Sequence, residues 1–434
     1  MPQLKILISG AGIAGTSLAF WLTKLGHSVT VAERHPALRT DGLQIDLRGP
    51  GVRVLRRMGA SLEAGFRARA APEQGAQVVD GSGRRRGFFP VNDTGKGLQS
   101  FTTEYEIMRG DFCRLLYDES KDVAEYRFGT HIESFEQDGD GVAVRFSGAA
   151  AGTAERFDLL IGADGVMSRT RRMMLGPDAK DAFKPLKGLV SGYFTIDRPM
   201  KKDEEYIATM YVGTNRRAVM TRRANPHKLQ VYIGGQIDPK RLDEVARGDV
   251  QQEKDMLADF LRGAGWETPE YVEAMRASDN FYCERLGIVR LDDWSRGRVV
   301  LAGDAAHCPS ATTGMGTTSA VVGAYILAGE LSRAFAGKDD GSSESRGDDD
   351  KISAAFRSYQ EKFQPFMQQV MRDLDEGSDP YKMVPTSAIG IGILNLIIGL
   401  VSFLRLHVLV SSLLREKVDD WQLPAYKELD VKDE

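Results

Sequence analysis

The spacing of apolar positions near the start of the chain changes from one period to another. Residues 5–9 form a short apolar run that predicts a buried strand, and residues 13–25 carry apolar side chains at helical spacing. Residues 28–32 form a second apolar run. Strand, helix and strand in this order predict a βαβ unit.

Similar patterns return later in the chain. Predicted buried strands occupy residues 157–161 and 298–302, and a long apolar helix rich in Ala and Gly is predicted at 316–335. Between about Leu186 and Arg285, by contrast, short β-rich segments are followed by amphipathic helices. Because 434 residues suffice for about two domains, we expect this middle region to form a second lobe, after which the first lobe resumes.

The segment Ala388–Leu404 is almost wholly apolar. Its length of about 17 residues is at the lower limit for a membrane span, and Asn395 and several glycines argue against one. We expect a buried helix that bridges the two lobes. A membrane-associated helix and a helix that binds a partner remain open alternatives.

Composition narrows the possible functions. The formal net charge of -4 offers no general attraction to nucleic acid, so no nucleic-acid partner is expected. The three cysteines lack the spacing of a zinc site or a disulfide framework, so no metal is expected. The first residues run into a predicted strand without the pattern of a secretory signal. We expect a cytoplasmic protein, with membrane association through 388–404 and the oligomeric state left open.

A glycine motif joins the first predicted strand to the first predicted helix. It consists of Gly10, Ala11, Gly12, Ile13, Ala14 and Gly15. Glycines there allow a tight turn and let backbone N–H groups approach a pyrophosphate at the helix N-terminus. Glu33 ends the next strand, where its carboxylate can accept hydrogen bonds from the ribose of an adenosine, and Arg34 follows it. The motif by itself fits either NAD or FAD.

Two further motifs decide between these cofactors. Residues 162–165 read Gly-Ala-Asp-Gly and are followed by Ser168 and Arg171, and residues 303–307 read Gly-Asp-Ala-Ala-His. Together with the glycine motif, they resemble the class A flavoprotein monooxygenases, a family that includes aromatic hydroxylases and the tetracycline-inactivating monooxygenases. The resemblance extends from Lys5 to about Leu331.

The resemblance implies cofactor contacts for a set of residues. It implies that Asp304 binds the ribityl chain of FAD, and that Asp164 is linked to both FAD and the nicotinamide nucleotide. Arg109 matches an arginine near the ribityl chain and phosphates. A looser match in the loop 39–48 implies FAD contact by Asp46 and nicotinamide-nucleotide contact by Arg39. The turn Gly314–Thr317, with Gly316, opens a helix that can face the flavin ring.

The implied fold is α/β, with a Rossmann-like FAD-binding domain of the GR2 type, a β-sheet substrate domain and a C-terminal helix. We expect the FAD-binding domain at 1–185 and 286–375, the substrate domain at 186–285 and a helical segment at 376–434. Alternation along the middle strands suggests that one inward face covers the substrate. Its expected members are Tyr193, Tyr211, Arg217, Met220 and Tyr232, with Tyr193 and Arg217 as catalytic candidates. Packing is the alternative role for Tyr193.

The implied reaction is oxygen insertion. NAD(P)H would reduce FAD, O2 would form a flavin C4a-hydroperoxide, and one oxygen atom would pass to a small aromatic, polyketide or alkaloid-like molecule of secondary metabolism. A second GxGxxG motif is absent from the sequence, so nicotinamide binding is expected to be transient. We expect His307 to be structural. A flavin-dependent halogenase and a non-catalytic FAD-binding or membrane-associated partner protein are the alternatives.

Overall fold

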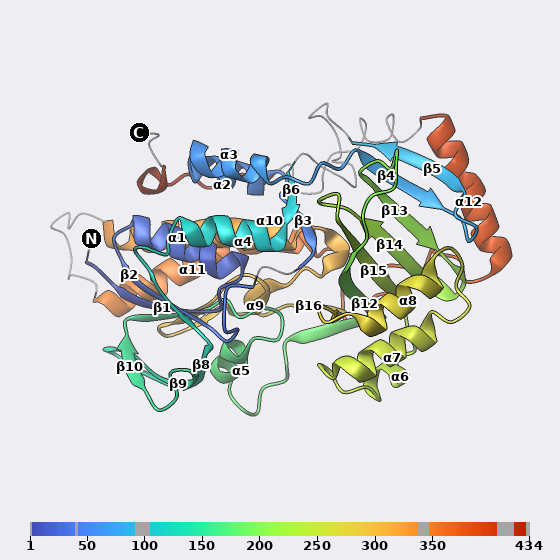
Figure 1. Ribbon diagram of the computed structural model, residues 1–434. Coiled ribbons are helices and arrows are strands. Elements are labelled where there is room, and N and C mark those ends of the chain that lie inside the picture. Colours follow the sequence, from blue (N-terminus) through green and yellow to red (C-terminus); the bar gives the residue numbers. More distant parts are fainter. Residues whose placement is uncertain (1, 40–41, 92–104, 337–346, 406–420, 431–434) are drawn as a thin grey trace.

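A mainly parallel six-stranded sheet organises the part of the molecule that contains the glycine motif. The computed structural model describes residues 2–39, 42–91, 105–336, 347–405 and 421–430 (Figure 1). The strand order of this sheet is β17 (Ser295–Arg296), β18 (Val299–Leu301), β11 (Leu159–Gly162), β1 (Lys5–Ser9), β2 (Ser28–Glu33) and β7 (Glu125–Phe128). Only the pairing of β17 with β18 is antiparallel. The predicted βαβ unit is confirmed, with α1 at Ile13–Lys24.

Helices and a small sheet enclose this central sheet. Helix α1 packs against α10 (Gly316–Ala336) and α4 (Arg109–Asp118), and α10 packs against α11 (Asp348–Val370). A three-stranded antiparallel sheet of β8 (Thr130–Asp138), β9 (Gly141–Gly148) and β10 (Ala154–Phe157) lies on the other side (Figure 1). Apolar side chains pack on both faces of this sheet. Burial on both faces explains why the sequences of β1 and β11 are continuous apolar runs.

Short elements connect this part to the second one. A two-stranded sheet joins β3 (Gln44–Asp46) to β6 (Glu106–Met108). The remaining short helices here are α2 (Pro50–Arg57), α3 (Ala60–Ala68), α5 (Arg169–Leu175) and α9 (Asp304–His307), with 3-10 turns η2 (Ala311–Thr313) and η3 (Lys427–Leu429).

A seven-stranded sheet forms the second part. Its order is β16 (Tyr282–Val289), β12 (Phe183–Asp197), β15 (Lys228–Gln236), β14 (Arg217–Arg222), β13 (Ile207–Val212), β4 (Gly75–Val79) and β5 (Arg85–Pro90), with the turn η1 at Thr214–Arg216. One face is covered by α6 (Pro239–Asp243), α7 (Val250–Phe260) and α8 (Thr268–Ala277), and a second apolar core lies between them. Strands β4 and β5 come from residues expected in the FAD-binding domain.

The C-terminal apolar helix is not where the sequence suggested. Helix α12 (Ala388–Phe403) packs against β5 at the outer edge of the seven-stranded sheet, far from the six-stranded sheet in Figure 1. Of its residues only Ile391 is buried, so the expected buried bridging helix is wrong. The chain returns afterwards, because Tyr426 is buried beside Tyr325 of α10 with their ring centroids 5.2 Å apart.

Candidate active site

The glycine turn between β1 and α1 has no room for side chains. Gly10 has a φ of 102°, and a Cβ atom there would lie 2.6 Å from the carbonyl oxygen of Ala163. A Cβ at Gly15 would lie 1.9 Å from the carbonyl oxygen of Gly10. Ala14 lies close to Gly303: a Cβ atom added to Gly303 would lie 2.7 Å from the Cβ of Ala14. The turn therefore exposes backbone at the N-terminus of α1, as a bound pyrophosphate requires.

Glu33 stands at the end of β2 and braces this turn. Its Oε2 accepts a hydrogen bond of 2.8 Å from the backbone N–H of Ala11, and its Oε1 accepts one of 2.8 Å from that of His35. Each carboxylate oxygen keeps a further lone pair, so the group can also receive a ribose hydroxyl. Arg34 is exposed next to it.

Arg109 begins α4 and extends across the glycine turn. A Cβ at Gly12 would lie 3.4 Å from a terminal guanidinium nitrogen of Arg109, so this cation borders the predicted pyrophosphate position. Gly42, with a φ of 147°, lies against the aliphatic part of the same side chain. Residues 40 and 41 of the quoted loop lie outside the described residues.

Asp46 is tied to an arginine that the sequence did not single out. Its Oδ2 lies 2.5 Å from Nε of Arg48. The backbone N–H of Arg48 donates to Oγ1 of Thr318 at 2.9 Å, and an added Cβ on Gly314 would lie 3.8 Å from the Arg48 guanidinium. Asp46 is thus connected through Arg48 to the glycine turn that precedes α10.

That glycine turn is shaped for close approach by a ligand. Gly314 has a φ of 65°, which favours glycine, and Gly316 starts α10 with open space where a Cβ would point. The N-terminus of the 21-residue helix α10 therefore lies at Gly316 and Thr317, where its positive end stabilises negative charge.

Asp304 and Asp164 follow adjacent parallel strands but differ in their surroundings. Burial raises the pKa of Asp304, although Cys308 and Arg109 partly oppose the shift. Asp164 instead binds the start of α5, because its Oδ2 accepts the N–H groups of Arg169 at 2.8 Å and Thr170 at 3.0 Å. Asp304 therefore remains available for a hydroxyl donor, whereas much of the hydrogen-bonding capacity of Asp164 is already used.

Three tyrosines line the face of the seven-stranded sheet that is turned toward these motifs. Tyr193 on β12 is paired in register with Tyr232 on β15 and with Tyr282 on β16. The ring of Tyr193 meets that of Tyr232 edge-on at 5.5 Å and stacks with that of Tyr282 at 6.1 Å. Tyr232 accepts a hydrogen bond of 3.2 Å from the backbone N–H of Gln44, so this face touches the first part of the fold.

Glu284 adds a carboxyl group to the tyrosine face. It lies two residues after Tyr282 on β16, and its Oε2 accepts a hydrogen bond of 3.5 Å from the hydroxyl of Tyr193. Burial, and then the negative charge of Asp304, raises the pKa of Glu284 to about 7. Burial also raises the pKa of Tyr193 well above its ordinary value, so the phenol stays protonated near neutral pH.

The sequence of this chain matches a known protein family. Residues 3–346 match the model described as an FAD binding domain. The FAD-dependent monooxygenase asL4 of Sarocladium schorii is 49% identical over 434 residues, covering 99% of both chains. The class A FAD-dependent monooxygenases are thus the family to which this chain belongs.

More distant monooxygenases agree in sequence and in fold. The flavin-dependent monooxygenase eupH of Phoma sp is 42% identical over 78% of this chain and 79% of its own. Among solved structures, the tetracycline destructase Tet(55) superposes with a TM-score of 0.73 at 27% identity, covering 98% of this chain and all of the other. The predicted α/β fold with a Rossmann-like FAD domain is confirmed.

The residues of the three motifs in this monooxygenase are compatible with FAD. Gly10, Gly12 and Gly15 leave the backbone of the turn uncovered where a pyrophosphate would lie, and Arg109 supplies a cation beside Gly12. Asp304 presents a buried carboxyl group at the end of a strand, and burial raises its pKa, so ribityl hydroxyls would stabilise its charged form. The open N-terminus of α10 then remains for the flavin ring.

Two of the expected substrate-facing residues lie on the wrong side of the monooxygenase's sheet. Arg217 donates a 2.9 Å hydrogen bond to the carbonyl of Arg262 and lies over the ring of Phe260, both beside the covering helices. The hydroxyl of Tyr211 accepts the N–H of Gly265 at 2.9 Å on that side. Met220, by contrast, pairs in register with Tyr232 and shares its face.

A buried charge cluster joins the two parts of the monooxygenase. The Arg222 guanidinium lies 2.5 Å from a carboxylate oxygen of Glu73 and 2.7 Å from one of Glu106. Burial, opposed by Arg222 and reinforced by Glu73, raises the pKa of Glu106 to about 8. The sequence does not reveal this cluster, because its members lie far apart along the chain.

His307 is structural, as expected. Its Nε2 lies 3.1 Å from the hydroxyl of Tyr359, and its ring packs against Trp294 and Phe363. Burial lowers its pKa to about 3, so the imidazole is neutral at physiological pH.

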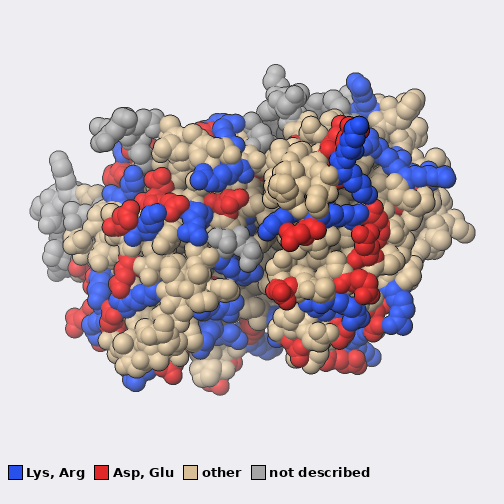
Figure 2. Space-filling view, viewed as in Figure 1, with Lys and Arg blue, Asp and Glu red and all other residues tan. Residues whose placement is uncertain are grey.

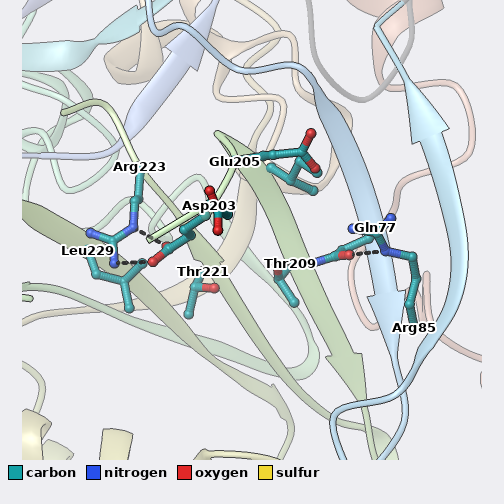
Figure 3. A pocket seen from close by; sticks show the side chains of 10 residues that line it. Gln77, Arg85, Asp203, Glu205, Thr209, Thr221, Arg223 and Leu229 are labelled. Atoms are coloured by element: carbon teal, nitrogen blue, oxygen red, sulfur yellow. Dashed lines mark hydrogen bonds and ion pairs between the residues drawn. The ribbon is translucent and has the colours of Figure 1, made fainter. Parts of the chain in front are cut away.

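A separate pocket of about 230 Å³ lies at β13–β15 and β4–β5, and its lining is shown in Figure 3. The side chains of Thr209 and Thr221 are paired in register on the sheet face opposite Met220. Two charged side chains there already have partners, because Arg223 pairs with Glu204 and Arg85 bonds to Gln77. This pocket is distinct from the tyrosine face.

Proposed function

We propose that this protein uses NAD(P)H and O2 to insert one oxygen atom into a small organic molecule bound on the tyrosine face. The observation that carries the proposal is the proximity of the tyrosine face to the FAD motifs, since Tyr232 bonds to Gln44 and the pKa of Glu284 is raised by burial and then by the charge of Asp304. When bound and reduced, FAD supplies the activation of O2. The remaining steps depend on how this chain holds the substrate.

The tyrosine face suits a planar, largely apolar substrate. Three aromatic rings offer stacking and edge contacts, and Met220 adds an adaptable apolar surface beside them. The same rings would exclude water from the reacting atoms, which prevents loss of activated oxygen as peroxide. An aromatic or polyketide-like molecule meets these requirements.

Tyr193 and Glu284 would handle the substrate proton. The protonated Tyr193 hydroxyl donates to a substrate oxygen or to Glu284, whose pKa of about 7 makes it a proton acceptor near neutral pH. A substrate hydroxyl placed beside this pair can lose its proton as the ring is attacked. The roles of both residues follow from their distance and shared environment.

The nicotinamide nucleotide would dock transiently at the rim of the face. The Arg39 guanidinium lies 5.3 Å from the ring centroid of Tyr282, where a cation can meet a nucleotide phosphate. Transient docking agrees with the single GxGxxG motif in the sequence. The relatives named as monooxygenases favour oxygen transfer over the halogenase and the non-catalytic alternatives.

Substrate-stimulated oxidation of the nicotinamide cofactor tests this proposal. FAD-loaded protein is mixed with NADH or NADPH under air and a panel of phenols, enones and indoles, and products are identified by mass. The proposal expects at least one compound to accelerate cofactor oxidation and to gain one oxygen atom. Cofactor oxidation that yields only peroxide with every compound, or no oxidation at all, contradicts it.

A further inference from the structure

Helix α12 lies on the surface with a defined inner face. The hydroxyl of Ser402 accepts the backbone N–H of Phe88 and donates to its carbonyl oxygen, each at 2.9 Å. Ile398 lies so close to Gly87 that an added Cβ would be 2.7 Å from its Cγ2. These contacts fix which side of α12 rests on β5 and therefore which side faces outward.

The outward side of α12 is apolar along its whole length. Phe403 is 84% exposed, Ile389 79% and Leu396 74%. Four more large apolar side chains on α12 and its C-terminal cap are over half exposed: Ile393, Ile397, Leu400 and Leu404. They recur at the three- and four-residue spacing of one helix face, where a surface helix of a globular protein normally carries polar side chains. A contiguous exposed apolar face of this kind marks an interaction site.

Positive charge borders this face. The segment 381–405 contains Lys382 and Arg405 but no Asp or Glu, although the whole chain has a net charge of -4. The neighbouring turn and strand add exposed Arg84, Arg85 and Arg86, of which Arg86 is paired with Asp80 at 2.5 Å. In Figure 2 the edge formed by α12 is mainly uncharged, with Lys and Arg side chains beside it.

We propose that α12 docks on an anionic lipid membrane, lying in the plane of the interface. The apolar face would enter the boundary between headgroups and acyl chains while the bordering cations meet anionic headgroups. With 16 residues, α12 is about 24 Å long, which is shorter than the roughly 30 Å hydrocarbon core. Among the residues that the structure describes, no helix has the length and apolarity needed to cross a membrane.

Charge separates this partner from a second copy of the chain. A symmetric dimer through α12 would place two copies of the same basic border, with Arg84 and Arg405, at one interface, and an excess of like charge there is unfavourable. An anionic lipid surface complements both the apolar face and its basic border. This inference does not depend on the proposed reaction.

Vesicle flotation of the full FAD-loaded chain tests the inference. The protein is mixed with vesicles of phosphatidylcholine alone or of phosphatidylcholine with phosphatidylserine. The test variant combines Leu396→Glu with Phe403→Glu, and the matched control combines Val123→Glu with Val250→Glu at exposed apolar positions elsewhere. Flavin absorbance and melting temperature show that each variant is folded.

We expect the wild type and the control to float with phosphatidylserine vesicles and the test variant to lose at least about tenfold in partitioning. Replacing Arg84 and Arg405 by Gln should weaken flotation and reduce its sensitivity to salt. Absence of wild-type flotation, or equal flotation of the test variant, overturns the inference. So does a dimer in gel filtration that the test variant converts to a monomer, since a second copy would then occupy the face.

Discussion

The hydroxyl of Tyr193 lies 3.5 Å from the carboxylate of Glu284, on adjacent strands of the seven-stranded sheet. Register pairing of β12 with β16 creates this proximity, and burial shifts both groups toward their protonated forms. The pair lies where the sheet faces the motifs that we propose hold FAD. Its predicted effects on turnover can be measured.

Tyr193→Phe should lower substrate-dependent turnover by about tenfold, the effect of losing one hydrogen bond in the transition state. Flavin content should not change, because the tyrosine face is separate from the glycine turn. Turnover is measured as product formation with the best compound of the panel. Arg217→Met serves as the control, since Arg217 lies on the opposite sheet face, and equal losses in both variants would refute the role of Tyr193.

Glu284→Gln should remove a pH dependence. With a pKa raised to about 7, Glu284 gains its charge as the pH rises through neutrality, and turnover that needs the carboxylate should rise over that range. The Gln variant should be slow and lack this inflection. The measurement is turnover against pH, and an unchanged inflection in the variant would show that another group causes it.

Asp304→Ala should weaken FAD binding by roughly tenfold to a hundredfold, because charge-assisted hydrogen bonds to ribityl hydroxyls are lost. FAD occupancy after gel filtration and the dissociation constant from flavin fluorescence both report this change. Asp122→Ala, at an exposed position, is the control. Full retention of flavin by the Asp304 variant would exclude the predicted contact.

Glu106→Gln should flatten the pH dependence of stability between pH 4.5 and 8. The folded state keeps a proton on this carboxyl up to a pKa of about 8, whereas the unfolded chain releases it near 4.5. Stability therefore falls as the pH rises through this window, by at most about 1.4 kcal/mol per pH unit. Urea unfolding at several pH values tests this, and equal slopes in wild type and variant would contradict it.

His307 should make stability fall as the pH is lowered, which is the opposite of the effect of Glu106. Its pKa is about 3 in the folded protein and near 6.5 in the unfolded chain, so protonation favours unfolding as the pH falls below 6.5. His307→Gln should lose stability at neutral pH but show a shallower decline between pH 6.5 and 5 than wild type. Parallel urea curves would argue against a neutral buried imidazole.

Much of the FAD-binding part could be predicted from the sequence, because its motifs are formed by residues close together along the chain. The turn from Gly10 to Gly15 needs glycine because a tight strand-to-helix connection leaves no space for a Cβ atom. Glu33 then lies at the end of the next strand. Family resemblance then supplied the roles proposed for Asp164 and Asp304. Those roles remain predictions, whereas the positions of both residues at strand ends are observed.

The substrate-facing residues of the seven-stranded sheet were harder to predict, because their contacts join residues far apart in the sequence. Arg217 and Met220 are three positions apart on β14, so strand alternation places them on opposite faces, and the expectation that both face the substrate was wrong. Alternation also does not reveal which face the helices cover. Strand β5 pairs with β4, but its basic start and lack of apolar alternation gave no strand signal in the sequence. Glu284 is a single acid in an ordinary strand, so no sequence signal singled it out. Helix α12 is apolar without being buried, so its composition wrongly suggested a buried helix.

The most direct test of the account is isotopic. FAD-loaded protein turns over the best compound of the panel with NAD(P)H under oxygen-18 gas, and the product is analysed by mass spectrometry. The account predicts one labelled oxygen atom in the wild-type product and a lower yield of the same labelled product from Tyr193→Phe. A product whose new oxygen comes from water, or an unlabelled oxidised product, would contradict it.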